Sequence, residues 1–188
     1  MKLSKMILPD GISTGGKLYK IKTGHPYWFR FAELLKKGER RLSVYDFLYE
    51  SEAPADRNKG FEELFKFFAP ERELPRAEKG DDGGETALDY ETDAELIYAA
   101  FLEQYGVDLF DKEIHWHKVL AMIAGLHSTK LNDIIGYRLY RKPAKGDSYD
   151  KDMMRLKRLW RIETDEDKEA AEREKDFFGK LKKPKMNT

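Results

Sequence analysis

The N-terminal apolar pattern is that of a short β element. Residues 6 to 22 hold isolated apolar positions that are separated by two turn signals, Pro9-Asp10-Gly11 and Gly15-Gly16. Paired glycines between short apolar runs are typical of strands that fold back on each other. The sequence therefore predicts a small β-hairpin or meander in this stretch.

Three short amphipathic helices are predicted between this element and residue 70. The first runs from Pro26 to Gly38, because its apolar residues recur three and four positions apart and glycine is a common helix stop. Ser43 is the candidate N-cap of the second helix. The third ends before Pro70, which disfavours a helical residue in front of it. The stretch from Ser51 to Lys59 is predicted to be a polar loop.

Residues 71 to 89 interrupt the helical pattern. They are rich in acidic residues, proline and glycine, and Leu74 and Leu88 are their only large apolar residues. Such a composition buries too little apolar surface to offset the entropy lost on ordering the chain. We expect an acidic linker here, and a long surface loop within one domain is the alternative.

The clearest helical periodicity follows from residue 90. Thr92 and Glu95 are spaced as a capping box, and Gly106 stands where the helix should end. The apolar face of this helix is predicted to consist of Tyr90, Ala94, Ile97, Tyr98, Phe101, Leu102 and Tyr105.

Two further helices complete a predicted three-helix unit over residues 90 to 142. Asp111 is expected to open the first of them, which ends at Gly125, and Ser128 or Thr129 is expected to open the second. Because the links between these helices are only a few residues long, consecutive helices should pack on one another.

Residues 143 to 188 are predicted to form a charged helical extension. Residues 138 to 161 hold nine Lys or Arg and three Asp, a formal charge of +6. The final stretch begins with carboxylates and ends in lysines, an order that the helix dipole favours. Between them lies an apolar stripe at helical spacing, which is our candidate partner-binding surface: Met153, Leu156, Leu159 and Trp160. A fourth core helix would show the same spacing.

These elements predict a mainly α fold with a small N-terminal β-hairpin (α+β). A compact helical unit would carry a charged C-terminal helix or tail. The expected divisions are residues 1–70, the linker or loop 71–89, the three-helix unit 90–142 and the extension 143–188.

The composition narrows the function classes. Among 188 residues, 35 Lys or Arg balance 35 Asp or Glu, so no overall field attracts nucleic acid or an anionic membrane. The chain has no cysteine, which excludes disulfides, thiolate metal sites and a thiol nucleophile. The run Met6-Ile7-Leu8 is far shorter than the roughly 20 apolar residues of a membrane span. We therefore expect no signal segment and no membrane association.

His115-Trp116-His117 is the candidate metal motif of the sequence. On a helix, residues two apart point about 200° away from each other, whereas a helical zinc pair needs residues four apart. We therefore predict no metal site. Trp116 or one histidine is expected to be buried with its ring nitrogen hydrogen-bonded, and the other histidine to face solvent.

Sequence motifs for catalysis are absent. The chain contains no GxxxxGK[ST], GxSxG or HExxH pattern, and the acidic pair Asp81-Asp82 falls in the expected linker. A catalytic carboxylate needs a shaped and partly dry pocket, which a glycine-rich acidic loop does not provide. We predict neither an enzyme nor a bound cofactor.

The basic segment 138–161 leaves a nucleic-acid-binding module as the alternative function. Its cations could hold phosphates while Tyr137, Tyr140, Tyr149 and Trp160 stack on bases. The opposing interpretation is a solvated helix face that offsets the acidic segment 71–95, which holds ten Asp or Glu and three Lys or Arg.

Several stretches resemble one protein family. They are the block from Tyr90 to Leu109, then His115-Trp116-His117-Lys118, Gly125-Leu126 and Ile134-Ile135-Gly136-Tyr137-Arg138, with Leu18 to Thr23 near the N-terminus. Over residues 6–142 the chain resembles the small siphophage protein labelled gene product fifteen, from temperate phages and prophages of Gram-positive bacteria.

The resemblance implies a non-catalytic role in phage tail morphogenesis, because genes of this family lie between those for the major tail protein and the tape-measure protein. By analogy of gene position, it implies a tail assembly chaperone or minor tail component in the bacterial host cytoplasm. The implied partners are the tape-measure protein, other tail proteins and further copies of the chain. The motif residues expected to be core are Ile97, Tyr98, Phe101, Tyr105 and Trp116.

Overall fold

A computed structural model describes residues 7–70, 86–145 and 147–163, together with Asp167, Glu169 and Arg173. The chain divides into two compact units, Met1–Gly136 and Tyr137–Thr188. The predicted fold class, mainly helical with an N-terminal hairpin, is confirmed. The described elements are β1 (Gly11–Thr14), β2 (Lys17–Lys20), α1 (His25–Lys36), the 3-10 helix η2 (Leu42–Leu48), α2 (Arg57–Phe68), α3 (Ala94–Tyr105), α4 (Trp116–Gly125), α5 (Lys130–Leu139) and α6 (Ser148–Leu159).

Two predicted segments fall largely outside the described residues. Of the acidic linker expected over 71–89, the structure describes residues 86–89. Of the terminal helix expected after residue 163, it describes Asp167, Glu169 and Arg173, which are helical. Leu88 packs against the hydrophobic core of the first unit, so at least the end of the expected linker is attached to that unit.

The hairpin forms where the glycine pair predicts it. β1 and β2 are antiparallel, with Gly11 opposite Lys20 and Thr14 opposite Lys17. Gly15 and Gly16 both have positive φ, at 60° and 80°. A two-residue turn of this kind needs the left-handed region at both positions, and glycine enters that region without a steric cost.

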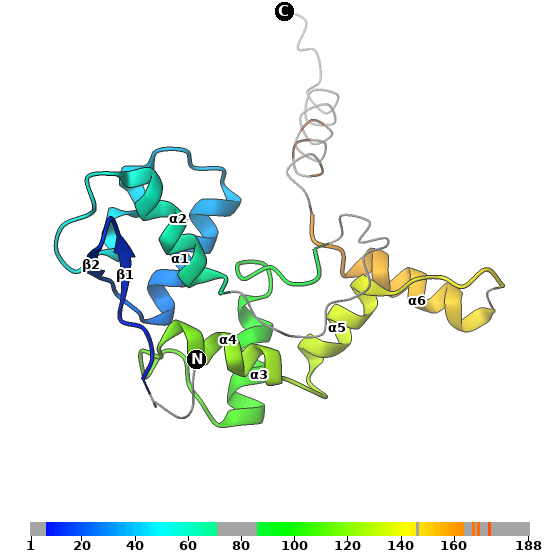
Figure 1. Ribbon diagram of the computed structural model, residues 1–188. Coiled ribbons are helices and arrows are strands. Elements are labelled where there is room, and N and C mark those ends of the chain that lie inside the picture. Colours follow the sequence, from blue (N-terminus) through cyan, green and yellow to red (C-terminus); the bar gives the residue numbers. More distant parts are fainter. Residues whose placement is uncertain are drawn as a thin grey trace, which may run out of the picture. The chain divides into compact units, whose positions relative to one another are not determined.

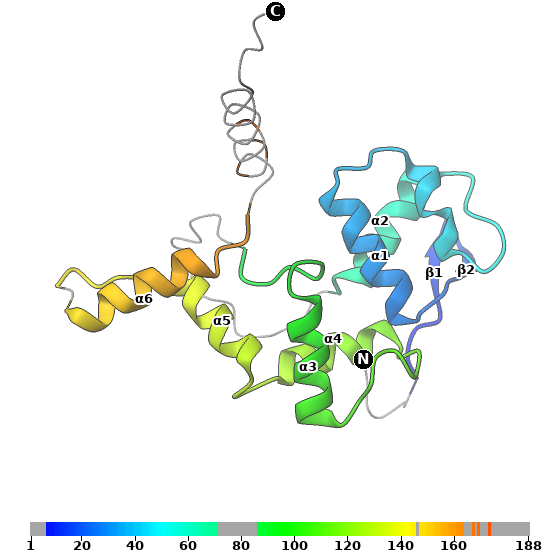
Figure 2. The same ribbon diagram turned by 180° about the vertical axis from the view of Figure 1, so that it is seen from behind.

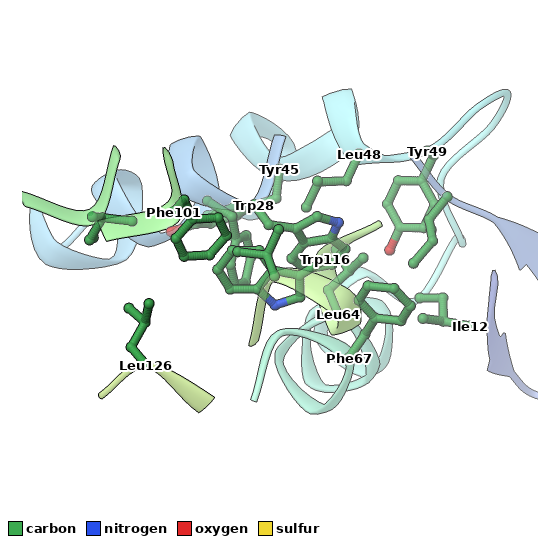
Figure 3. Packing of buried hydrophobic residues seen from close by; sticks show 14 of the residues in the cluster. Ile12, Trp28, Tyr45, Leu48, Tyr49, Leu64, Phe67, Phe101, Trp116 and Leu126 are labelled. Carbon is green, nitrogen blue, oxygen red and sulfur yellow. The ribbon is translucent and has the colours of Figure 1, made fainter. Parts of the chain in front are cut away.

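An aromatic core holds the first unit together (Figure 3). The indoles of Trp28 and Trp116 are fully buried and stack with ring centroids 6.5 Å apart. Phe68 lies almost parallel to Trp116 at 5.3 Å, so α1, α2 and α4 meet at this cluster. In Figures 1 and 2 the hairpin lies beside α2, and α2 also packs on η2. Large flat rings bury much apolar area for little side-chain entropy, which suits a unit with such short helices.

The prediction of the second helix is wrong in the type of helix and in the N-cap residue. Residues 42–48 form the 3-10 helix η2, its N-cap is Arg41, and Ser43 lies inside it. α2 also begins earlier than expected, because the Asp56 carboxylate accepts a hydrogen bond from Lys59 N at 3.1 Å and caps the helix. The last three residues of the predicted polar loop 51–59 are therefore helical.

The capping box predicted for Thr92 and Glu95 does not form. α3 begins at Ala94, and its N-cap Asp93 makes no capping bond to the helix. Asp89 Oδ1 instead accepts hydrogen bonds from Thr92 N at 2.7 Å and from Glu91 N at 3.2 Å. This turn satisfies donors that a helical first turn would otherwise expose. The predicted stop at Gly106 is confirmed, with φ of 61°.

The helix predicted to begin at Asp111 begins at Trp116. Residues 113–115, which we call the strap, instead lie beside the start of α1. His25 N donates to Ile114 O at 2.8 Å, Trp116 N donates to Thr23 O at 2.7 Å, and Gly24 forms a β-bridge with His115. Backbone groups bonded across the fold in this way cannot also bond within a helix.

Among the residues that the structure describes, no helix combines the length and the apolar character that a membrane span requires.

Candidate partner-binding surface

The motif residues of the resemblance lie mainly in the core of the first unit. Ile97, Phe101 and Trp116 are buried. Tyr98 and Tyr105 are half-buried and use their hydroxyls at the rim. Tyr105 OH donates to Met122 O at 2.8 Å and Tyr98 OH donates to Asp108 Oδ2 at 3.2 Å. Substituting these residues would therefore act first on stability.

The imidazoles of His115 and His117 bind backbone groups. His115 Nδ1 accepts from His117 N at 3.1 Å, so its Nε2–H is the donor to Pro9 O at 2.9 Å. His117 is buried, stacks on Phe67 at 4.4 Å and donates from Nε2 to Phe67 O at 2.8 Å. Within residues 7–70, 86–145 and 147–163, no three His, Asp or Glu side chains gather as a metal site.

Sequence reasoning missed a third histidine in this network. His25 Nδ1 accepts from Ile114 N at 3.1 Å, and its Nε2–H donates to Leu109 O at 3.1 Å. His25 thereby fastens the strap to the start of α1. A helix-terminal histidine gives no signal for partners that lie more than eighty residues away in sequence.

Acid should weaken the first unit through His25 and His115. Burial lowers the pKa of both imidazoles; Glu113 opposes this shift for His25, and Lys118 adds to it for His115. As the pH falls through about 6.5, histidines of the unfolded chain take up protons that these two do not, so the free energy of unfolding falls. Urea melts between pH 7.5 and 5.5 measure this slope, and His115→Gln should flatten it. An unchanged slope in His115→Gln would contradict this role of His115.

The second unit holds α6 against the segment that leads into it. Asp147 and Asp150 form a reciprocal capping box at the start of α6, and Tyr140 OH donates to Asp150. That hydrogen bond lowers the pKa of Asp150 and raises the pKa of Tyr140 to about 12. At the other end, Arg138 Nε donates to Trp160 O at 2.7 Å and Lys157 Nζ donates to Tyr140 O at 2.9 Å.

These anchors decide which face of α6 is exposed. Of the predicted stripe, Met153, Leu156 and Trp160 are half-buried, and Leu159 is 71% exposed. Tyr149 is 62% exposed and lies seven residues before Leu156, hence on the same side of the helix. The exposed apolar residues of α6 are therefore Tyr149 and Leu159, and we call these two together with the half-buried Leu156 between them the exposed apolar stripe. The spacing from Tyr149 to Leu156 was the signal that could have added Tyr149.

Positive charge flanks the exposed apolar stripe. Lys151, Arg155 and Arg158 are exposed and form a row along one side of it, with Arg155 one turn before Leu159. The exposed Asp152 lies one turn from both Tyr149 and Leu156, so the flanking charge is positive in balance but not throughout. Two other cations of the predicted basic segment are turned inward: Arg138 is buried and Lys157 is half-buried. α6 thus presents an apolar strip with a cationic margin.

Comparison with known proteins places the chain in a family. The profile described as bacteriophage Gp15 protein matches residues 8–162, which is most of the chain. The chain belongs to the bacteriophage Gp15 family. The predicted resemblance is confirmed, and the match extends past residue 142 to include α6. No curated protein and no solved structure matches the chain.

Membership of the Gp15 family indicates a phage structural or morphogenesis role. The family is one of structural phage proteins. Three assignments are more specific than this role and belong to the function proposed below. They are a tail position, a chaperone activity and a tape-measure partner.

A hollow of about 500 Å³ lies between α1 and residues 88–91 of this Gp15-family chain. Lys36 reaches across it, with Nζ 2.9 Å from Asp89 Oδ1 and 3.2 Å from Glu91 Oε2. These ion pairs fasten the end of the expected linker to α1. The charges of Lys36, Asp89 and Glu91 are therefore paired within the chain.

Proposed function

We propose that the chain is a non-catalytic tail morphogenesis protein, a tail assembly chaperone or minor tail component that acts with the tape-measure protein. It would act in the cytoplasm of the bacterial host before or during tail polymerisation. Family membership supports the phage structural role. The tail-specific part rests on the gene position that the resemblance implies.

The observation that carries this proposal is the exposed apolar stripe of α6. Leu159 and Tyr149 are 71% and 62% exposed on one side of a short helix, and the exposed Arg155 lies one turn before Leu159. An apolar strip with charged margins is the form that amphipathic helices recognise when they pack side by side. A long helical partner such as a tape-measure protein offers such faces repeatedly.

α6 is also prepared for binding before a partner arrives. A free helix of this length is marginal in water, and a partner would have to supply the free energy of ordering it. The capping box at Asp147 and the bonds from Arg138 and Lys157 hold α6 in place instead. A partner that binds α6 therefore has to supply less free energy to order the helix.

Co-expression with overlapping tape-measure fragments tests the proposal. We expect the wild-type chain to keep one or more fragments soluble and to co-purify with them. Tyr149→Ser together with Leu159→Ser should weaken binding by about thirtyfold or more, because loss of a central apolar anchor costs about 2 kcal/mol. Leu18→Ser is the matched control, since Leu18 is similarly exposed but lies in the hairpin.

Thermal melts should show all three proteins folded, because the substituted side chains face solvent. If the double variant binds every fragment as tightly as Leu18→Ser does, the α6 stripe is not the contact. If no tape-measure fragment binds the wild-type chain, the proposed partner is wrong.

Two cations of the basic segment form hydrogen bonds inside the protein, and this weakens the alternative function of nucleic-acid binding. Arg138 and Lys157 bind the backbone oxygens of Trp160 and Tyr140, which leaves fewer cations for phosphates. Binding through the remaining charges should be weak and should fall steeply with salt. We therefore place protein partners first.

A further inference from the structure

A second exposed apolar feature lies on the first unit. Phe110 is 88% exposed, the largest exposed fraction among the large apolar residues that the structure describes. Its ring lies 5.3 Å from the ring of Tyr98 on α3. Leu102, one helical turn after Tyr98, is half-exposed on the same side. We call Tyr98, Leu102 and Phe110 the α3 patch.

The α3 patch is held in a fixed arrangement. Asp108 Oδ2 accepts from Tyr98 OH at 3.2 Å, and its other oxygen accepts from Phe110 N at 2.8 Å. The same carboxylate therefore holds the hydroxyl of Tyr98 and the backbone of Phe110, whose ring lies beside that of Tyr98. An exposed aromatic residue that is fixed in this way has already lost part of the freedom that binding would remove.

The surroundings of the α3 patch are acidic. Residues 91–113 contain seven Asp or Glu and one Lys, a formal charge of −6. Asp111 is exposed and acts electrostatically on Tyr98, whose pKa is raised by its hydrogen bond to Asp108 and by these carboxylates. The patch is thus an aromatic strip with anionic margins.

The exposed stripe of α6 has the opposite character. Lys151, Arg155 and Arg158 form a row of exposed cations along one side of it, against the single exposed anion Asp152, and the segment 138–161 has a formal charge of +6. The two surfaces match in apolar content and are opposite in charge. Charge complementarity of this kind selects partners and orients their approach.

We propose that the α3 patch of one copy of the chain binds the α6 stripe of a second copy, head to tail. Because the two surfaces differ, each added copy presents both again, so the contact is heterologous and builds a ring or an open filament. This inference goes beyond the proposed function, because it concerns the chain alone. A tape-measure helix bound to α6 would compete with the second copy.

Mixing two variants is the decisive experiment. Phe110→Ser removes the patch and keeps α6, whereas Tyr149→Ser with Leu159→Ser removes the stripe and keeps the patch. By sedimentation velocity, the wild-type chain should form species that grow with concentration, and each variant alone should associate at least about thirtyfold more weakly. An equimolar mixture should form a 1:1 dimer that grows no further, because it retains one intact contact.

Several results would overturn the inference. They are a wild-type chain that stays monomeric up to several hundred micromolar, a variant that still associates like the Leu18→Ser control, or a mixture that forms no dimer. The last result would indicate a symmetric contact or another surface. Asp111→Lys is a second test of the patch, since it retains Phe110. It should weaken association with the wild-type α6 stripe. Mixing it with a second copy that carries Arg158→Glu should restore association.

Experiments can distinguish a failure of the tape-measure proposal from a failure of the self-association proposal. Phe110→Ser should weaken self-association by about thirtyfold or more and still bind tape-measure fragments, because it leaves α6 unchanged. Loss of fragment binding with self-association intact would count against the proposed partner alone.

Discussion

Trp116→Ala is expected to lower the free energy of unfolding of the first unit by about 3–5 kcal/mol, the range for removing a large buried aromatic side chain. Trp116 is fully buried and its ring contacts Phe29, Phe68 and Tyr90. Its Nε1–H donates to Phe68 O at 2.8 Å, so the substitution also leaves that carbonyl without this donor. A domain of ordinary stability would lose much of its margin.

Urea unfolding followed by circular dichroism measures this loss. Trp116→Phe should cost less, since it retains most of the ring packing but not the hydrogen bond. Leu18→Ala is the control and should stay within about 0.5 kcal/mol of wild type, as exposed substitutions usually do. A Trp116→Ala protein as stable as that control would show that the aromatic cluster does not hold the unit together.

Arg138→Ala is expected to release α6 while the first unit stays folded. Arg138 is buried, and its donation to Trp160 O fixes the C-terminal end of the helix. Hydrogen bonds from charged groups contribute about 1.5–3 kcal/mol, and a twelve-residue helix has little stability of its own. Amide exchange across α6 should therefore become roughly ten to a hundred times faster.

Hydrogen exchange read by mass spectrometry reports this change directly. Arg155→Ala is the matched control, because Arg155 lies on the exposed side of the same helix. Peptides from α3 and α4 should exchange as in wild type for both variants. Unchanged exchange of α6 in Arg138→Ala would mean that other contacts hold the helix.

Elements that depend on local sequence were predicted well. The glycine pair at Gly15-Gly16 gave the hairpin, and Gly38 and Gly106 marked helix ends, because a positive φ restricts the residue type at that position. The start of α4 was misplaced because distant groups decide it. Nothing near Asp111 in the sequence shows that the following backbone bonds to Thr23 and His25.

The candidate partner-binding surface was also predicted only as far as local sequence determines it. The spacing of Leu156 and Leu159 identified an apolar stripe on a helix. Which side of α6 turns inward depends on Arg138 and Tyr140, which bind Trp160 and Asp150 across a loop. Periodicity reports that a face is apolar and leaves open what covers it. The α3 patch was missed because Phe110 lies outside any periodic segment.

Hydrogen exchange of the complex with a tape-measure fragment tests directly whether α6 is the surface that binds this partner. Exchange should be compared for the free chain and for the chain saturated with the fragment that co-purifies with it. If α6 is the contact helix, peptides covering residues 149–159 become strongly protected while peptides from the hairpin do not change. A complex whose protection lies elsewhere and leaves α6 exchanging as in the free chain would contradict it.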